Sequence, residues 1–327
     1  MTKHVKAAIV QDSPVPLAID ASIEHVIKLT KAAIETGARV IAFGETFIGG
    51  YPAWLEHIPA PALWDHPGTR DLHALLLKQA VRGKDPRFAP LQWAVDIAGV
   101  VVSVGGYERV RSSLYNSQFL FRPKAPALVH RKLLPNPAER LLFGSGDGST
   151  LDVHEWHMGR VGQLISDEHW MPLARAAMHH AGESIHVASW PTVGDIALLA
   201  SSHYAYEGRS FVLAAGTLQT RADILEGFDR AGGSGPARQL LERLPDGRLQ
   251  HGRSAIIAPD GVMIAQAGEA PTILTADLDL AEIDRGLATL DVDGQAARPD
   301  VFELRVDRRP RTGIVDIEDG EAESAAA

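Results

Sequence analysis

Short apolar runs alternate with stretches of helical periodicity along most of the chain. Runs with the length and β-branched composition of buried strands occur at residues 5–10, 39–45, 100–107, 114–122, 161–165, 185–190, 209–218 and 272–278. Apolar residues spaced three and four apart predict helices at 19–37, 72–81, 87–98, 170–182 and 197–207. The turn signal Pro259-Asp-Gly261, between 254–258 and 263–267, indicates a hairpin. This alternation favours a layered α/β fold, with 272–278 as a last core strand.

Three stretches lack a periodic apolar pattern. Residues 46–54 are rich in glycine and aromatic side chains and predict a loop. Residues 129–148 contain two prolines and three glycines, which also predict mostly loop. Residues 222–246 are polar and glycine-rich, so we expect a surface excursion carrying one short helix. Because no linker divides the chain, we expect a single domain over 1–306, followed by a charged and partly disordered tail over 307–327.

The composition is that of an ordinary globular protein. Of 327 residues, 45% are hydrophobic and 22% are charged, and the formal net charge is −9. The chain has no basic cluster of the kind that binds nucleic acid, and no apolar run near the ~18 residues of a membrane span. Its N-terminus lacks the apolar core of a signal peptide, so we expect a cytoplasmic protein. It has no cysteine, which excludes disulfides, thiolate metal sites and a cysteine nucleophile in this sequence.

Ser166 stands where a predicted strand turns into a predicted helix. The strand is 161–165, and the helix over 170–182 has Pro172 in its first turn and Gly182 at its end. Such a turn lifts its residue to the edge of the sheet and aims helix N–H groups at whatever that residue attacks, which is the position of a nucleophile. The alternative is that Ser166 only caps the helix.

Two other polar residues, Glu45 and Lys132, follow apolar strands or lie just beyond them. A carboxylate, an ammonium and a nucleophile are a workable set for attack on a C≡N or C=O carbon. The carboxylate takes the nucleophile's proton, and the ammonium stabilises charge on the substrate heteroatom. Glu139 is a second carboxylate that would orient the lysine or assist with water. Surface ion pairs and solvated charges are the alternative explanations; the catalytic one predicts Glu45, Lys132 and Ser166 in one pocket.

The stretches around these residues occur together, in the same order, in one known family. They are residues 43–52, 130–132, 139–149, 162–173, 185–191, 206–213 and 297–301. They resemble the nitrilase superfamily, and most closely its true nitrilase branch. The resemblance implies a four-layer α-β-β-α sandwich, hydrolysis of a small-molecule nitrile to a carboxylic acid and ammonia, and no metal or organic cofactor. It also implies a homo-oligomer built from dimers, which in some relatives extends into spiral filaments.

The same resemblance implies roles for the four polar residues. Glu45 corresponds to the general base, Lys132 to the catalytic lysine and Glu139 to the second glutamate. Ser166 occupies the position of the family's nucleophilic cysteine, which forms thioimidate and thioester intermediates. A serine hydroxyl is a weaker nucleophile than a thiol at neutral pH, so we expect low activity. Three explanations stay open: an inactivated variant, a cysteine-free relative, or a serine used productively.

We expect five further residues to line the substrate pocket: Tyr51, Trp54, Asp167, His169 and Trp190. Four lie near catalytic positions in sequence and Trp190 ends a predicted strand, and pockets combine apolar walls with few polar groups. For Trp54 and Trp190 the alternative is a role in the core. Asp167 stands where many nitrilases carry an aromatic or small residue, which leaves the preferred nitrile open.

Two other functions stay possible from the sequence. An amidase or carbamoylase of the same superfamily would use the same residue types. A non-catalytic binding or assembly relative is the alternative of a different class. The presence of Glu45, Lys132 and Glu139 favours an enzyme, because a scaffold has no chemical need for them.

Overall fold

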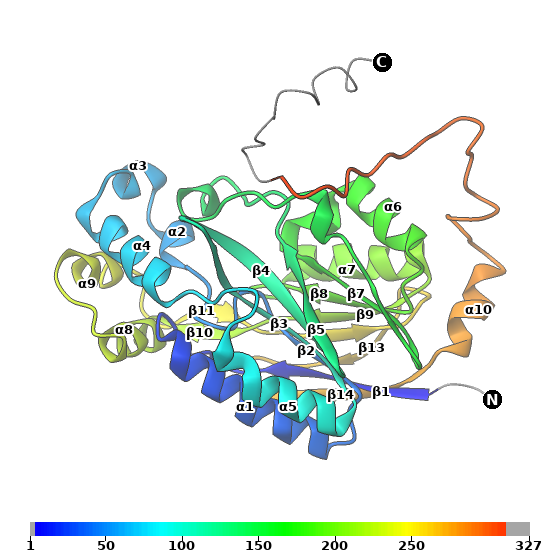
Figure 1. Cartoon of the computed structure of the whole chain (residues 1–327), viewed down its shortest axis with the longest axis horizontal. Helices are drawn as coiled ribbons and strands as arrows, with labels where there is room; N and C mark the ends of the chain where they lie inside the picture. Colours follow the sequence, from blue (N-terminus) through cyan, green and yellow to red (C-terminus); the bar gives the residue numbers. More distant parts are fainter. Residues whose placement is uncertain (1–3, 312–327) are drawn as a thin grey trace, which may run out of the picture.

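The computed structural model describes residues 4–311. Within them the strands form two six-stranded sheets and a two-stranded ribbon (Figure 1). In spatial order, the first sheet contains β14 (Thr272–Asp279), β1 (His4–Gln11), β2 (Val40–Phe43), β3 (Val101–Val110), β4 (Ser113–Arg122) and β5 (Ala125–Arg131). The second contains β13 (Met263–Gln266), β12 (Ala255–Ile257), β9 (Phe211–Ala215), β8 (Ile185–Ser189), β7 (Gly159–Ile165) and β6 (His154–Trp156). The ribbon pairs β10 (Leu218–Thr220) with β11 (Arg248–His251).

Ten α-helices and four short 3₁₀ helices connect these strands within residues 4–311. The α-helices are α1 (Ile19–Glu35), α2 (Trp54–His57), α3 (Ala60–Leu63), α4 (Pro67–Gln79), α5 (Ala89–Ala98), α6 (Pro172–His180), α7 (Asp195–Gly208), α8 (Arg221–Arg230), α9 (Pro236–Leu241) and α10 (Ala281–Leu287). The 3₁₀ helices are η1 (Pro86–Phe88), η2 (Glu139–Leu141), η3 (Gly148–Thr150) and η4 (Ser166–Trp170). None of the helices in this part of the chain combines the length and apolar composition that a membrane crossing needs.

The strand β1 shows how the sequence separates the layers. Successive side chains of a strand point to opposite faces of its sheet. Val5, Ala7 and Ile9 therefore belong to the apolar cluster between the two sheets. Ala8 and Val10 point the other way and belong to the cluster beneath the helices. A strand buried on both faces reads as a continuous apolar run, as this one does.

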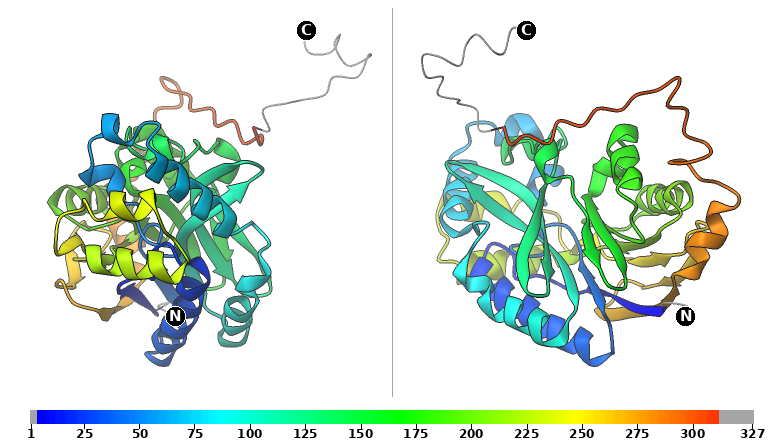
Figure 2. Two further views of the ribbon diagram at one scale, coloured as in Figure 1. Left: turned by 90° about the vertical axis from the view of Figure 1, so that its left-hand side faces the viewer. Right: turned by 45° about the vertical axis from the view of Figure 1, so that its right-hand side comes forward.

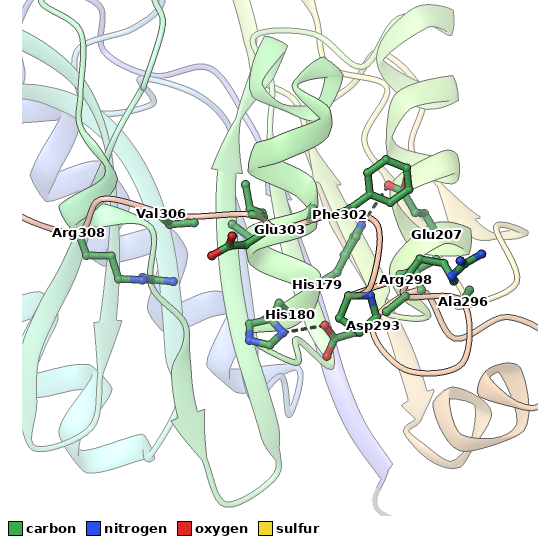
Figure 3. Close-up of a pocket in the computed structure, with 16 residues that line it drawn as sticks. His179, His180, Glu207, Asp293, Ala296, Arg298, Phe302, Glu303, Val306 and Arg308 are labelled. Carbon is green, nitrogen blue, oxygen red and sulfur yellow. Dashed lines mark hydrogen bonds and ion pairs between the residues drawn. The ribbon is translucent and has the colours of Figure 1, made fainter.

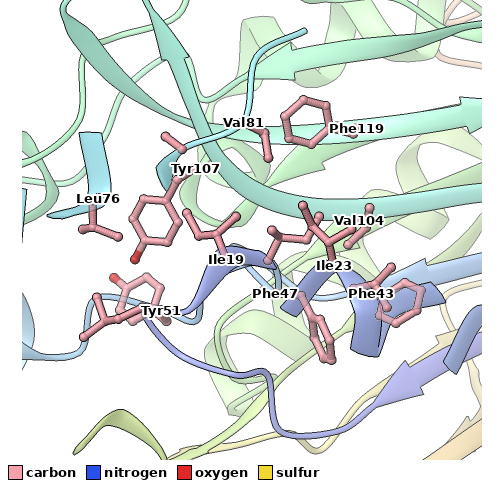
Figure 4. Packing of buried hydrophobic residues seen from close by; sticks show 14 of the residues in the cluster. Ile19, Ile23, Phe43, Phe47, Tyr51, Leu76, Val81, Val104, Tyr107 and Phe119 are labelled. Atoms are coloured by element: carbon pink, nitrogen blue, oxygen red, sulfur yellow. The ribbon is translucent and has the colours of Figure 1, made fainter. Parts of the chain in front are cut away.

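The helices cover the outer faces of both sheets. Ile19 and Ile23 of α1 belong to one cluster with Phe43, Val104 and Phe119 of the first sheet (Figure 4). On the second sheet, β7, β8 and β9 pack against α6 and α7 through a separate cluster. Figure 2 shows the two sheets facing each other with α1 and α5 on one outside and α6 and α7 on the other. The predicted four-layer α-β-β-α order is confirmed.

Several predicted elements differ from the structure. The stretch predicted as loop at 129–148 begins inside β5, and the single strand predicted at 209–218 divides into β9 and β10. The strand at 272–278 is not a core strand, because β14 lies at the edge of its sheet, antiparallel to β1, and most of its side chains are partly or fully exposed. The helix α10 was not predicted.

The stretch predicted as a surface excursion at 222–246 carries two helices, α8 and α9. Each has a buried face: Ile224 and Phe228 on α8, and Leu240 and Leu241 on α9, belong to the same apolar cluster as α1. The prediction was wrong because glycine and charge dominate the composition of this stretch, while its apolar residues keep the helical spacing that burial requires.

The predicted tail begins against the rest of the protein. Asp147 accepts a hydrogen bond from the backbone N–H of Arg311 at 2.7 Å, and Arg308 donates to the carbonyl of Leu151. The tail beyond residue 311 lies outside the described residues.

Candidate active site

The two sheets approach each other closely at the end of β2. Glu45 follows that strand, and its N–H donates to the carbonyl of Trp190, which follows β8, at 3.1 Å. A Cβ on the preceding residue, Gly44, would lie 2.7 Å from Thr217 Cγ2 and 2.9 Å from the Trp190 carbonyl oxygen. Only glycine fits there, so the close approach that places Glu45 depends on Gly44.

Lys132 lies one residue beyond β5 and holds two carboxylates. Its Nζ donates to Glu45 Oε1 at 3.0 Å and to Glu139 Oε1 and Oε2 at 2.9 and 2.8 Å. All three side chains are buried. One ammonium between two carboxylates leaves an excess of negative charge when all three are ionised, in surroundings that screen it poorly.

Burial and the neighbouring charges shift the pKa of both Glu45 and Lys132. Burial raises the pKa of Glu45 to about 8, although the nearby ammonium of Lys132 lowers it. Burial would lower the pKa of Lys132, but the charges of Glu45 and Glu139 outweigh it and raise that pKa. The lysine is therefore an ammonium at neutral pH, and the carboxyl of Glu45 titrates close to neutrality, where an acid–base group works best.

Glu139 is fixed by groups on three sides. In addition to Lys132, its Oε2 accepts from the backbone N–H of Asn136 at 2.9 Å. Tyr51 OH lies 3.2 Å from Glu139 Oε1 and 2.8 Å from Glu56 Oε1. These contacts leave the Glu139 carboxylate in one orientation, against the ammonium.

Glu45 has one oxygen bound and one oxygen free. Its Oε1 accepts from Asn116 Nδ2 at 2.6 Å as well as from Lys132. Its Oε2 is buried and has no hydrogen-bond partner within residues 4–311. Buried carboxylate oxygens are seldom left without a partner, so a free one is a candidate proton acceptor.

Ser166 occupies a strained turn at the end of β7. Its φ is +49°, which is uncommon for a residue other than glycine and is a mark of functional turns. Ser166 is buried, with 7% of its surface exposed. The preceding residue pairs with Ser189 across parallel strands, and Ser189 is followed by Trp190, whose carbonyl accepts the N–H of Glu45. Ser166 therefore lies at the same end of the second sheet as Trp190, which contacts Glu45 of the first sheet.

Glu168 ties the Ser166 turn to the segment that carries the lysine. Its carboxylate accepts from the backbone N–H groups of Ile165 and Leu133, both at 2.7 Å, and from His130 Nε2 at 2.8 Å. Burial would raise the pKa of Glu168, but the charge and hydrogen bond of His130 outweigh it and lower that pKa. The residues flanking Lys132 on both sides are thus bonded to the turn that begins at Ser166.

Sequence reasoning missed the role of Glu168. Its place three residues after Ile165, in the first turn of a helix, is the pattern of a carboxylate that reaches back to the strand end. Its partners are His130 in β5 of the first sheet and Leu133 just beyond that strand, and neither contact has a signal in the sequence.

The five residues predicted to line the pocket lie in different surroundings. Tyr51 contacts Glu139, and Trp54 is buried in the apolar cluster beneath α1. Trp190 is buried, with its indole N–H donating to Ser201 at 3.2 Å. His169 is buried beneath the turn, with both ring nitrogens hydrogen-bonded within the protein, whereas Asp167 is exposed. Contact with a substrate stays a prediction for all five.

Residues of α6, α7 and the segment 292–308 line a cavity of about 760 Å³ (Figure 3). Its lining includes none of the predicted site residues. Within residues 4–311, no group of three His, Asp or Glu side chains is arranged to hold a metal ion.

Known proteins resemble this chain along most of its length. The family model for carbon-nitrogen hydrolases matches residues 6–286. An aliphatic nitrilase from Sinorhizobium fredii is 39% identical over 96% of this chain and 99% of its own length. A nitrilase from Bradyrhizobium diazoefficiens is 36% identical over 94% of each chain.

Solved structures share the fold at lower identity. A member of branch 10 of the nitrilase superfamily from Saccharomyces cerevisiae has a TM-score of 0.64 and 15% identity, covering 90% of this chain and 97% of that one. An amidase of the nitrilase superfamily from Nesterenkonia has a TM-score of 0.61 and 17% identity, covering 87% and 94%. With the family match and the sequence relatives, these findings show that the chain belongs to the carbon-nitrogen hydrolase family of the nitrilase superfamily.

Proposed function

We propose that this protein is a nitrilase, which converts a small nitrile to a carboxylic acid and ammonia. In this proposal Glu45 is the general base, Lys132 stabilises charge on the substrate nitrogen, Glu139 orients Lys132, and residue 166 is the nucleophile. The names of the relatives at 39% and 36% identity support the nitrile as substrate class. No residue of the proposed mechanism needs a metal or an organic cofactor.

One observation supports the acid–base assignment above all others: Glu45 Oε2 is buried without a partner while its other oxygen is held by Lys132 and Asn116. A base must keep one oxygen available for the proton that it takes. The ammonium, already fixed by two carboxylates, is placed to interact with charge that develops beside Glu45. Both features are present before any substrate binds.

The chemistry balances for a thiol at position 166. The thiol proton passes to Glu45, the sulfur bonds to the nitrile carbon, and Glu45 returns that proton to the nitrogen to give a thioimidate. Water adds to that carbon, ammonia leaves, and a thioester forms. A second water hydrolyses the thioester, releasing the acid and restoring the thiol. With Ser166 the first step starts from an alcohol, so we infer that the chain as written turns over very slowly.

The test compares this chain with its Ser166→Cys variant on aliphatic nitriles, aryl nitriles and the matching amides, measuring ammonia and both possible products. We expect the variant to release acid and ammonia from at least one nitrile. Glu45→Gln in the Ser166→Cys background is the matched control and is expected to abolish turnover while leaving the fold intact. Hydrolysis of amides but no nitrile would replace this proposal by an amidase, and no hydrolysis at all would favour a non-catalytic relative.

We also propose that residues 1–306 form one catalytic unit that works in the cytoplasm as a homo-oligomer. The outer surface of α6 and α7 supports self-association. Leu173, Ile196 and Leu199 are 68%, 66% and 58% exposed there, although large apolar side chains are normally covered. Sedimentation of the full chain at micromolar concentration tests this, and a monomer would refute it.

A further inference from the structure

A chain of buried polar side chains runs from the carbonyl of Ser166 into the interior beside the second sheet. His169 Nδ1 lies 2.7 Å from the Ser166 carbonyl oxygen, and His169 Nε2 lies 2.9 Å from His186 Nε2. His186 Nδ1 lies 2.9 Å from Glu183 Oε1, and Tyr204 donates to Glu183 Oε2 at 2.5 Å. All of these residues are buried. The reaction proposed above uses none of the four side chains beyond Ser166.

The residues around these buried side chains leave room for the Glu183 carboxyl group and pack against the His186 ring. A Cβ on Gly162 of β7 would lie 1.5 Å from Glu183 Oε1, so the carboxyl group occupies the space that a side chain would take. The rings of His186 and Tyr204 stack with their centroids 3.9 Å apart. A side chain at position 162 would expel the carboxyl group, which gives this glycine a specific role on the strand that leads to Ser166.

The order of donors along the chain follows from chemistry. A carbonyl oxygen can only accept, so His169 Nδ1 must carry the hydrogen that bonds Ser166. In a neutral imidazole the other nitrogen is then an acceptor, so His186 Nε2 must carry a hydrogen. If His186 is neutral too, its Nδ1 accepts, and Glu183 must donate as a carboxylic acid. Together, the side chains of Glu183, His186 and His169 therefore carry one more proton than they would with Glu183 ionised and both imidazole rings neutral.

The position of that proton follows from burial. Burial raises the pKa of Glu183 to about 8 and lowers the pKa of His169 to about 3. Burial likewise lowers the pKa of His186 well below its usual value. At neutral pH the proton therefore resides on Glu183, and both rings are neutral.

We propose that Glu183, His186 and His169 act as positioning residues, forming a relay that holds one proton and fixes the carbonyl of residue 166 and with it the strained turn that presents the nucleophile. The catalytic importance of the relay rests on the proposed function, whereas its hydrogen-bond order does not. The residue at 166 sits at φ +49°, a conformation that persists only where neighbouring contacts enforce it. The bond from His169 to its carbonyl is such a contact.

Loss of the proton breaks one of two hydrogen bonds of the relay. With Glu183 ionised, His186 turns its N–H toward the carboxylate and presents a lone pair to the lone pair of His169. Either that contact or the bond to the Ser166 carbonyl is then lost. The titratable and charged groups packed around the relay are His179 and Arg175 of α6, Tyr204 of α7, Glu168 of η4 and His130 of β5. We therefore expect the turn to loosen as pH rises through about 8, the pKa of Glu183.

The first test uses the chain as it stands and needs no activity. Two-dimensional ¹⁵N NMR of the imidazole rings distinguishes a protonated ring nitrogen from a bare one. The signals of the 14 histidines are assigned by comparison with His169→Gln and His186→Gln. We expect hydrogen on Nδ1 of His169 and on Nε2 of His186 near pH 7. Hydrogen on Nε2 of His169 with a bare Nδ1 would overturn the proposal.

The second test measures the nucleophile directly. Because the chain has no cysteine, Ser166→Cys introduces a single thiol, whose alkylation by iodoacetamide can be followed even if no nitrile is hydrolysed. In this background Glu183→Gln keeps a donor toward His186 and an acceptor toward Tyr204 at every pH. We expect its alkylation rate to equal that of the parent near pH 7. Near pH 9, one unit above the pKa of Glu183, the alkylation rate of the Ser166→Cys parent should fall to about a tenth of the rate of the Glu183→Gln variant.

Two further variants complete the second test. His186→Phe, which breaks the relay at every pH, should alkylate at least about tenfold more slowly near pH 7. Glu207→Gln is the matched control, because Glu207 contacts His179 and Arg175 but not the relay, and it should follow the parent at both pH values. A parent-to-Glu183→Gln ratio that stays constant with pH, or an unfolded Glu183→Gln, would refute the relay. A failed nitrile assay with a pH-dependent ratio would refute only the proposed function.

Discussion

Removing the charge of Lys132 tests how the candidate active site is held together. In Lys132→Met the side chain keeps nearly the same length but leaves Glu45 and Glu139 buried without their shared cation. Breaking a buried ion pair by removing one partner costs roughly 3–5 kcal/mol. We take about 4 kcal/mol, because Asn116 and the N–H of Asn136 still donate to the two carboxylates.

This free energy converts to a measurable shift in melting temperature. At roughly 2.1 cal/mol/K per residue, unfolding 327 residues carries an entropy of about 0.7 kcal/mol/K. A loss of about 4 kcal/mol therefore lowers Tm by about 6 °C. Without the ammonium the pKa of Glu45 rises further above its unfolded value of 4.5, so the folded state binds protons that the unfolded state releases. The loss is therefore larger at pH 8 than at pH 6.

Circular dichroism at both pH values measures the shift in the chain as it stands. Lys28→Met, on the exposed face of α1, is the matched control and should change Tm by less than about 1 °C. The triple variant Glu45→Gln, Lys132→Met, Glu139→Gln removes all three charges together and should recover most of the lost stability. A Lys132→Met variant within about 1 °C of the Lys28→Met control would refute the charge cluster described here.

Three other substitutions or conditions have expected outcomes. Gly44→Ala should lower the free energy of unfolding in urea by more than about 2 kcal/mol, because the added Cβ would overlap backbone and side-chain atoms. Gly194→Ala is the matched control and should be nearly neutral, because a Cβ there would have no atom within 4 Å. Stability should fall between about pH 6.5 and 8, since the raised pKa of Glu45 and Glu183 makes the folded state hold more protons than the unfolded one there; a rise in urea midpoint over that range would contradict this. Trp190→Ala should cost roughly 3–5 kcal/mol as a core residue, and a loss below about 1 kcal/mol would exclude that role.

The sheets could be predicted from the sequence because their physical cause is local. Alternate residues of β1 face different apolar layers, and a strand buried on both faces must be apolar throughout. The same reasoning failed for β5, whose side chains are mostly half-exposed and include Pro126. It failed for α8 and α9 because their few apolar residues are spread among glycines and charges. A sequence pattern predicts a buried strand or helix only where apolar residues make up most of that segment.

The residues of the candidate site were predictable one at a time, and their connections were not. Glu45, Lys132 and Ser166 follow apolar strands, which the sequence shows directly. The contact of Glu168 with Leu133 and His130 joins two sheets, and no local pattern reports the distance between them. His169 was predicted to line the substrate pocket because it is close to Ser166 in sequence, and that stays a prediction. No signal in the sequence indicated the partners of its two ring nitrogens, the Ser166 carbonyl and His186.

In the proposed mechanism, the identity of residue 166 decides whether Glu45 can act as the base. Moving a proton from a thiol of pKa ~8.5 to Glu45, whose pKa is about 8, costs less than about 1 kcal/mol. A hydroxyl near the acidity of water, pKa ~15.7, would be about 8 units weaker, which is about 10 kcal/mol. His169 cannot take that proton, because its acceptor nitrogen is bonded to His186.

In the proposed mechanism, the pKa of Glu45 therefore suits a thiol at position 166, and we expect an alcohol there to be almost inert. Ser166→Cys should raise nitrile turnover by several orders of magnitude, with the gain in kcat rather than in KM, because substrate binding does not need the proton transfer. Single-turnover kinetics of the two forms measures this directly. Equal rates would mean that Ser166 loses its proton by another route, and that Glu45 is not the base.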